Sequence, residues 1–162
     1  MKKALILMIA TLACATPGAN EDAKQQLEKE IMATVNRFLH AVNTADTALM
    51  EELIRPEAMT YARIQESHGK FTTKARQQAH FLEDLRQDPQ YYERIWDPVI
   101  LVDEQIAAVW AQYDFYVGGE FSHCGTDLFT LVRENGAWKI ANSVWTVVKV
   151  GCPPSPLGEI SD

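Results

Sequence analysis

The sequence predicts an α+β domain in which helices come first and a sheet of long antiparallel strands follows. Two observations predict this class. Apolar residues recur at helical spacing early in the chain, and from residue 91 onward four β-rich segments alternate with short turn signals. The 162 residues are 47% hydrophobic and 23% charged, which is typical of a globular domain and not of a disordered or disulfide-dense chain.

The first nineteen residues have the pattern of a secretory signal peptide. Two lysines precede an apolar run at residues 4–13, and small residues suited to cleavage lie at 13–15. The run is too short to span a bilayer, which takes about 20 apolar residues. Because residues 11–14 partly resemble a lipobox, attachment of a lipid at Cys14 is a second route. Both routes predict an exported protein, periplasmic or extracellular, and the second predicts a lipoprotein.

The charge balance and the motifs exclude several partners. With 15 basic and 22 acidic residues the formal charge is −7, which disfavours a nucleic-acid partner or an anionic membrane surface, apart from the lipid anchor. The sequence has no HExxH or CxxC spacing, no phosphate-binding glycine loop and no Gly-x-Ser-x-Gly motif. We therefore expect no metal and no cofactor.

The first third of the chain is predicted to be mainly helical. Apolar residues at helical spacing predict an amphipathic helix over 22–43. A short helix follows, with Asp46 as its N-cap and Pro56 at its end. Two short strands and a third helix complete this part, over 59–65, 70–73 and 74–86.

The rest of the domain is predicted to be a β-meander. Hairpin turns join its strands, and Asn135-Gly136 is the strongest of these turn signals. The proline-rich residues 153–162 form a tail, so the domain is predicted to span residues 20–152. The predicted strands cover residues 91–102, 105–117, 120–133 and 137–150.

Four segments carry a family resemblance: YERIWDP at 92–98, AVWA with YDFY at 108–116, FSHCG with Asp127 at 121–127, and GAWKI at 136–140. Together they resemble secreted members of the nuclear-transport-factor-2-like superfamily, in particular its SnoaL-like and putative lumazine-binding groups. The resemblance implies a cone, the cystatin-like α+β roll, in which a curved antiparallel sheet wraps around the long N-terminal helix and leaves a pocket at the open end. The superfamily includes isomerases, cyclases, dehydratases and non-catalytic domains, so the fold does not settle the function.

Two-residue hairpin turns predict which side chains share a face of the sheet. They place Asp114 opposite His123, and Trp110 opposite Asp127. We assign this face to the helices, because it has an apolar end and a polar end, as a ligand pocket requires. The expected ligand-binding residues are Trp110, Gln112, Tyr116, Phe129, Asn142, Tyr61 and Phe38.

Three residues are candidates for catalysis. Asp114 could orient and charge His123 as a general base, or the two could brace the rim of the cone. Asp127 against aromatic walls would have a raised pKa and could carry protons, or it could be a buried acid satisfied by nearby donors. Both alternatives stay open for each candidate.

The opposite face of the sheet predicts a partner. It would carry Tyr113, Phe115 and Trp145, whose exposure is costly, so we expect a homodimer through this outer face. Cys124 also falls on this face. It would lie opposite Val147, so a disulfide with Cys152 needs the tail to fold back; otherwise Cys124 is a packed thiol.

Three functions are compatible with these expectations. The first is an exported domain that binds a small, partly apolar molecule. The second is a cofactor-independent isomerase, cyclase or dehydratase that transfers protons through Asp and His side chains. The third is a dimerising protein-interaction module. An open cavity with converging polar groups favours the first two, and a cone packed solid favours the third.

Overall fold

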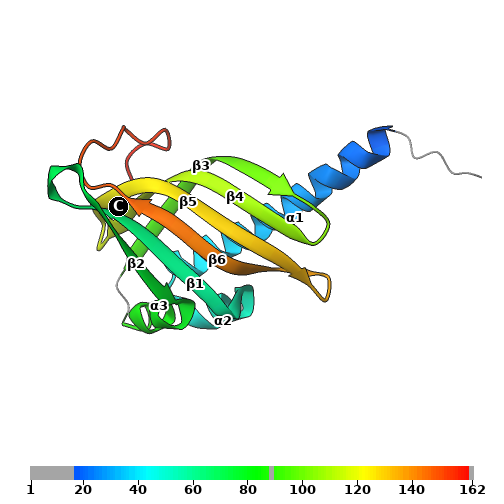
Figure 1. The fold of residues 1–162 in the computed structure, drawn as a ribbon, viewed down its shortest axis with the longest axis horizontal. Coiled ribbons are helices and arrows are strands. Elements are labelled where there is room, and N and C mark those ends of the chain that lie inside the picture. Colours follow the sequence, from blue (N-terminus) through cyan, green and yellow to red (C-terminus); the bar gives the residue numbers. More distant parts are fainter. Residues whose placement is uncertain (1–16, 88–89, 161–162) are drawn as a thin grey trace, which may run out of the picture.

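A computed structural model describes residues 17–87 and 90–160 of the chain. Figure 1 shows a curved sheet on one side of the long helix α1, which runs along the sheet and projects beyond it. The helices are α1 (Pro17–Asn43), α2 (Thr47–Leu53), α3 (Gln78–Leu85) and the 3-10 turn η1 (Ser67–Gly69). The strands are β1 (Ile54–Gln65), β2 (Phe71–Gln77), β3 (Tyr91–Val102), β4 (Ile106–Val117), β5 (Glu120–Glu134) and β6 (Ala137–Val147).

The six strands form one sheet in the order β2-β1-β6-β5-β4-β3. Neighbouring strands are antiparallel except β1 and β6, which are parallel. A parallel pair needs a long crossover, and here everything from β2 to β5 lies between the two strands in sequence. The predicted α+β class, a curved sheet wrapped around a long N-terminal helix, is confirmed.

Most elements lie where the sequence predicts them. The bounds of β3 match the prediction, and the Asp46 side chain caps α2 by accepting a hydrogen bond of 2.9 Å from the Leu49 N–H. The third helix begins later than expected, at Gln78, because residues 74–77 continue β2 and pair with β1. Pro56 does not end α2 but lies inside β1, where the pairing with β6 is irregular.

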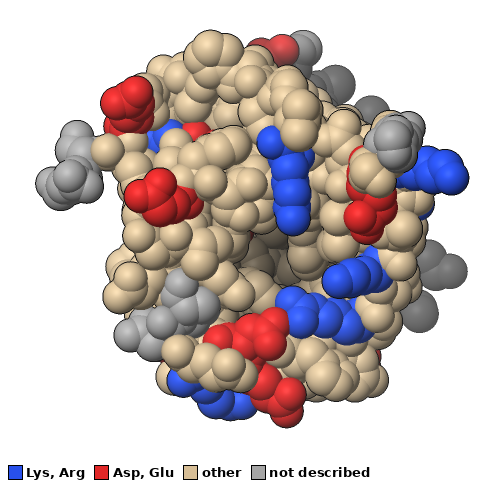
Figure 2. All heavy atoms as spheres, turned by 90° about the vertical axis from the view of Figure 1, so that its left-hand side faces the viewer, with Lys and Arg blue, Asp and Glu red and all other residues tan. Residues whose placement is uncertain are grey.

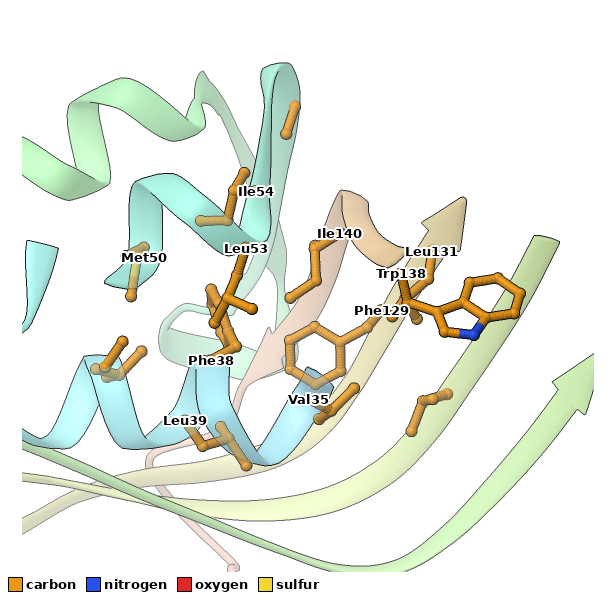
Figure 3. Packing of buried hydrophobic residues seen from close by; sticks show 14 of the residues in the cluster. Val35, Phe38, Leu39, Met50, Leu53, Ile54, Phe129, Leu131, Trp138 and Ile140 are labelled. Carbon is orange, nitrogen blue, oxygen red and sulfur yellow. The ribbon is translucent and has the colours of Figure 1, made fainter. Parts of the chain in front are cut away.

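The core lies between α1 and the concave face of the sheet. The apolar stripe of α1 supplies Val35 and Phe38, and the Phe38 ring meets the edge of Phe129 at a centroid distance of 5.5 Å. Figure 3 shows these side chains packed with Leu131, Trp138 and other residues of the same cluster. Burying an aromatic side chain of this size contributes about 2–3 kcal/mol, so this contact fixes the helix on the sheet.

β-Bulges in β5 and β6 change the register that hairpin turns predict, and the β3–β4 pairing also shifts by one residue between Trp96 and Val99. Tyr116 pairs with Phe121 as expected, but Phe115 pairs with His123, so Ser122 is an extra residue in β5. In the same way Ala141 is an extra residue in β6, since Leu131 pairs with Ile140 and Thr130 pairs with Asn142. Each extra residue turns every later side chain of one strand to the other face relative to its neighbour.

The expected face assignment is therefore wrong for part of the sheet. Asp114 pairs with Cys124 and not with His123, and Trp110 pairs with Leu128 and not with Asp127. On β4 it is the odd-numbered residues that face the helices. After the bulge in β6 the inward residues are Ser143, Trp145 and Val147.

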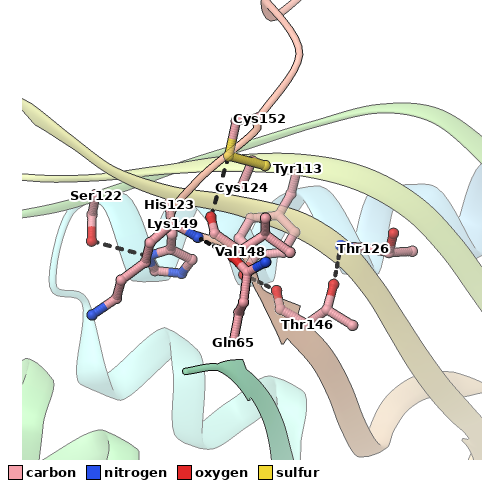
Figure 4. Close-up of a disulfide and its surroundings, with 10 residues drawn as sticks. All are labelled: Gln65, Tyr113, Ser122, His123, Cys124, Thr126, Thr146, Val148, Lys149 and Cys152. Atoms are coloured by element: carbon pink, nitrogen blue, oxygen red, sulfur yellow. Dashed lines mark hydrogen bonds between the residues drawn. A yellow bond between two sulfur atoms is a disulfide. The ribbon is translucent and has the colours of Figure 1, made fainter. Parts of the chain in front are cut away.

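The C-terminal segment folds back over the convex, outer face of the sheet. Cys124 and Cys152 form a disulfide with a Cα–Cα distance of 5.9 Å, which settles the open alternative in favour of a bonded pair (Figure 4). The bond closes a loop of 28 residues, worth about 3–4 kcal/mol in the chain-entropy account. Farther along, the Gly158 carbonyl accepts a hydrogen bond of 2.9 Å from Arg94 Nη2. The segment is thus fastened at two points.

Residues 1–16 of the predicted signal peptide, with Cys14, lie outside the described residues, and residues 17–19 begin α1. Within the described ranges no helix is long and apolar enough to cross a membrane.

Candidate functional site: a cavity in the concave face of the sheet

The concave face of the sheet encloses a cavity of about 410 Å³ together with α1 and α3. It opens where β4 and β6 end and β5 begins, and Figure 2 shows a hollow at this end of the molecule. Its volume lies in the range of small-molecule pockets. The wall is mainly apolar and aromatic: Phe38, Ala62, Ile64, Phe81, Tyr91, Phe115, Val117, Phe129, Trp145 and Val147.

Two carboxyl groups lie inside this cavity, Glu93 from β3 and Asp127 from β5. Asp127 is 5% exposed, and its Oδ2 atom has no N–H or hydroxyl donor among the described residues. The two carboxyl groups lie close enough that each changes the pKa of the other. Two neighbouring carboxyl groups in a buried site do not both ionise readily, so one of them keeps a proton.

Burial sets the protonation of this pair. It raises the pKa of Glu93 to about 7. The nearby Asp127 carboxyl group acts in the opposite direction, and the negative charge of Asp114 adds to the rise. Burial also raises the pKa of Asp127 well above its usual range, and the charge of Glu93 raises it further. Of the two acids, Asp127 therefore keeps its proton more firmly. The pair offers a proton donor and a proton acceptor to a bound molecule.

The end of α1 positions Glu93. The Asn43 amide donates to the Glu93 carbonyl at 3.0 Å and accepts from the Glu93 N–H at 2.7 Å. These two bonds join the last residue of α1 to the strand that carries the carboxyl group. The helix α1 therefore contributes to the core and also fixes the position of Glu93 in the cavity.

Tyr113 forms the wall next to the pair and depends on a glycine. It is 2% exposed, and its hydroxyl donates to the Thr146 carbonyl at 2.7 Å. Its ring lies over Gly125, where an added Cβ would lie 2.7 Å from the ring and collide with the Thr146 backbone. Burial, followed by the nearby charges of Asp127 and Glu93, raises the Tyr113 pKa, so the phenol stays protonated.

His123 lies nearer the opening than Asp127. Its ring stacks on Phe115 at a centroid distance of 4.9 Å, and Nδ1 lies 2.9 Å from the Ser122 hydroxyl (Figure 4). Burial, and then the positive charge of Lys149, lowers the His123 pKa to about 4. The imidazole is thus neutral at physiological pH, and its partner is not the carboxylate that the sequence suggested.

Asp114 lies on the outer face, and its position corrects the expected Asp114–His123 pair. It is 2% exposed and accepts two hydrogen bonds from Arg94, of 2.9 and 2.5 Å. The same guanidinium donates to the Tyr116 hydroxyl at 3.1 Å and to the Gly158 carbonyl. A buried, bidentate ion pair of this kind holds the C-terminal segment. It does not reach the cavity.

The remaining expected ligand-binding residues divide between the two faces. Phe38 and Phe129 line the cavity. On the outer face Trp110 is 51% exposed, and the Gln112 amide donates to the Thr126 hydroxyl at 3.1 Å. Three others, Tyr116, Asn142 and Tyr61, also lie outside the cavity, with Asn142 Oδ1 accepting from the Met59 N–H at 3.0 Å.

Glu93 is the main residue of this site that the sequence reasoning missed as a functional candidate. The alternation Tyr91, Glu93, Ile95 contains a signal, because an acid between two inward apolar residues of a strand is itself directed inward. Tyr113, Phe115 and Trp145 were expected on the outer face and line the cavity instead. Both bulges contribute to this exchange.

The described part of the chain holds no group of three His, Cys, Asp or Glu residues that could bind a metal ion. The chemistry available in the cavity is that of the acid pair, a neutral imidazole, several hydroxyl groups, the Gln78 amide, and the cations Lys74 and Arg76. This set can donate and accept hydrogen bonds or move a proton to or from a bound molecule.

Comparisons with solved structures agree on the fold. A conserved protein from Planctomyces limnophilus has 18% identity and a TM-score of 0.65 over 78% of this chain and 99% of its own. A nuclear transport factor 2-like superfamily protein from Salmonella enterica has 18% identity and a TM-score of 0.61 over 82% and 99%. A protein of unknown function with a cystatin-like fold from Nostoc punctiforme has 12% identity and a TM-score of 0.58 over 80% and 94%. No curated protein matches the sequence significantly.

A curved sheet that surrounds an apolar pocket with a few polar groups is suited to binding a small molecule. The chain belongs to the family described as "Putative lumazine-binding", which matches residues 26–146. The family resemblance expected from the sequence is thereby confirmed.

The acid pair predicts a pH-dependent stability. Because the pKa of Glu93 is raised from 4.5 to about 7, the folded state holds a proton that the unfolded chain has lost, so stability falls as the pH rises through this window. His123 has the opposite effect, since its lowered pKa makes stability rise between about pH 4 and 6.5. We expect Glu93→Gln to remove the first effect and to gain about 2–3 kcal/mol over the unmodified protein at pH 8.

Chemical denaturation at pH 5 and pH 8 measures this difference. The exposed Glu104→Gln is the matched control and should follow the unmodified protein at both pH values. If the curves of Glu93→Gln and the unmodified protein run parallel from pH 5 to pH 8, the raised pKa of Glu93 is excluded.

Proposed function

We propose that this protein is an exported domain that binds a small, partly apolar molecule in the cavity of its concave face. The observation that carries the proposal is the combination of an open cavity of about 410 Å³, a mainly aromatic wall and the Glu93–Asp127 pair inside it. An open cavity favours a binding domain over a protein-interaction module, whose cone would be filled by side chains.

Export is supported by two observations. The N-terminal residues have the charged and apolar regions of a signal peptide, with Cys14 as the site of a lipid in the alternative route. The disulfide between Cys124 and Cys152 is typical of proteins from oxidising compartments. We infer a periplasmic or extracellular location.

Binding in the cavity is tested by filling it. Ala62 lines the cavity, so Ala62→Phe should reduce the affinity for the apolar fluorophore N-phenyl-1-naphthylamine by about tenfold or more, since a phenyl group takes the space of the probe. Lumazine, which the family description names, serves as a second probe. Fluorescence titration measures both.

Ala108→Phe provides the matched control, because Ala108 precedes the inward Val109 on β4 and lies on the outer face. It should leave the affinity of both probes unchanged. Equal loss in the two variants, or no effect of Ala62→Phe with the fold intact, would contradict a ligand site in the cavity.

A second function is favoured by the acid pair itself. Glu93 can accept a proton and Asp127 can donate one, in a site with apolar walls. Such a pair supports the alternative of a cofactor-independent isomerase, cyclase or dehydratase. Removal of a proton beside a carbonyl by Glu93, with protonation elsewhere on the molecule by Asp127, would leave the total number of protons unchanged.

This alternative is tested with a simple β,γ-unsaturated ketone, 3-cyclohexenone, whose conversion to the conjugated isomer is followed by ultraviolet absorption. Asp127→Asn removes the titrating acid and should lower the rate by about 100-fold or more. Ser143→Ala changes a cavity residue that does not titrate and should keep most of the rate. If the unmodified protein converts 3-cyclohexenone no faster than buffer does, the isomerase alternative is excluded and the binding function remains.

We also propose that two copies associate through the outer face of the sheet. Five apolar residues form one row across five strands: Tyr61, Val144, Leu128, Trp110 and Val99. The C-terminal segment and the neighbouring polar row of Gln112, Thr126 and Thr146 line a common hollow, and the apolar row lies outside it. A row of this kind on the outer face supports a dimer more directly than the aromatic residues expected from the sequence, which line the cavity.

Trp110→Glu should yield monomers, because a carboxylate buried at a dimer interface costs several kcal/mol and raises the dissociation constant by about 100-fold or more. Sedimentation velocity measures the assembly. Leu157→Glu, on the exposed part of the C-terminal segment, is the control and should not change it. A dimer that persists in Trp110→Glu would exclude this row as the interface.

A further inference from the structure

The opening of the cavity is basic although the protein as a whole is acidic. The chain carries a formal charge of −7, yet Lys74 and Arg76 of β2 line the cavity, and Lys149 is close enough to His123 to affect its charge. Figure 2 shows Lys and Arg side chains on more than one side of the hollow, with Asp and Glu side chains on the same face. Basic side chains beside an opening can attract an anion.

Two of these cations are free to meet a ligand. Arg76 is paired with Asp84 at 2.7 Å and lies over the Phe81 ring, so much of its charge is already matched. Among the described residues, no carboxylate lies within 4.0 Å of the ammonium groups of Lys74 or Lys149, and both side chains are exposed. Their charges therefore remain available at the opening.

The sheet register relates these cations to the acid pair. Lys74, Ala62, Trp145 and Asp127 stand in one row across β2, β1, β6 and β5. Three strand spacings separate the first from the last, about 14 Å along the sheet and less across its concave face. A molecule with an apolar body can therefore reach the acid pair at one end and Lys74 at the other.

The polar groups inside the cavity complement this arrangement. Asp127 is buried with an unpartnered oxygen, and the pair holds a proton that it can donate to a carbonyl or hydroxyl oxygen. A second anionic group at this depth would meet the charge of the pair in a poorly solvated site, which is costly. The anionic group of a ligand is thus favoured at the opening and disfavoured in the interior.

We propose that the ligand is an amphipathic organic anion, with its apolar body in the cavity, a neutral oxygen on the Glu93–Asp127 pair, and its anionic group between Lys74 and Lys149. This proposal rests on the proposed function and adds the charge and the orientation of the ligand to it.

A matched pair of fluorophores tests the proposal. N-phenyl-1-naphthylamine is neutral, and 8-anilinonaphthalene-1-sulfonate has the same ring system with one added sulfonate. We expect the anion to bind the unmodified protein more tightly than the neutral probe, and to lose this advantage as the salt concentration rises. Lys74→Gln and Lys149→Gln should each weaken the anion by about three- to fivefold, as expected for one solvent-exposed ion pair, and should affect the neutral probe clearly less.

Lys29→Gln is the control, because it removes the same charge from the exposed part of α1 that lies far from the opening (Figure 1). It should change neither affinity. Ala62→Phe is titrated with the same probes. It should reduce the fluorescence of a probe bound in the cavity and should not change the fluorescence of a probe bound at the apolar row of the outer face.

The outcomes distinguish the two proposals. If the neutral probe binds in the cavity and the anion binds no better, or if the lysine variants affect both probes equally, the anionic ligand is excluded and the binding function stands. If Ala62→Phe changes the binding of neither probe, the binding function fails and the orientation proposed here fails with it.

Discussion

The contact between α1 and the concave face of the sheet is the interaction on which the rest of this structure depends. Phe38 and Phe129 meet in the core, and Asn43 at the end of the same helix is hydrogen-bonded to both backbone groups of Glu93. Because the curved sheet is wider than one helix, the helix fills one end of the concave face and leaves the other end hollow. The core and the cavity thus lie on the same concave face of the sheet.

Register shifts in β3, β5 and β6 decide what this surface contains. Ser122 in β5 and Ala141 in β6 shift the register by one residue each, and strongly curved sheets require such bulges. As a result Tyr113 and Trp145 face inward, while Asp114 faces outward and holds the C-terminal segment through Arg94. The polar chemistry of the cavity then comes from carboxyl groups on strands that are not neighbours.

The charges of the molecule are arranged along the axis of the cavity. The interior holds an acid pair that burial keeps partly protonated, and the opening holds lysines in full contact with water. Such a gradient costs stability at high pH, because the folded state resists the loss of the buried proton. Buried acids that reduce stability are often found at functional sites, and the position of Glu93 and Asp127 in the cavity agrees with a role in ligand binding.

The sequence by itself determined the class of the fold, the strands from residue 91 onward, the cap of α2 and the family. The fold class, the strands and the cap depend on local patterns, such as helical spacing, turn residues and capping side chains, which act within a few residues, and the family was identified by the resemblance of four short segments. Only the tertiary structure decided the register, the partner of Asp114 and the meeting of Glu93 with Asp127. A bulge has no strong local signal, since it forms to relieve the curvature of the whole sheet, and one added residue reverses the face of every side chain beyond it.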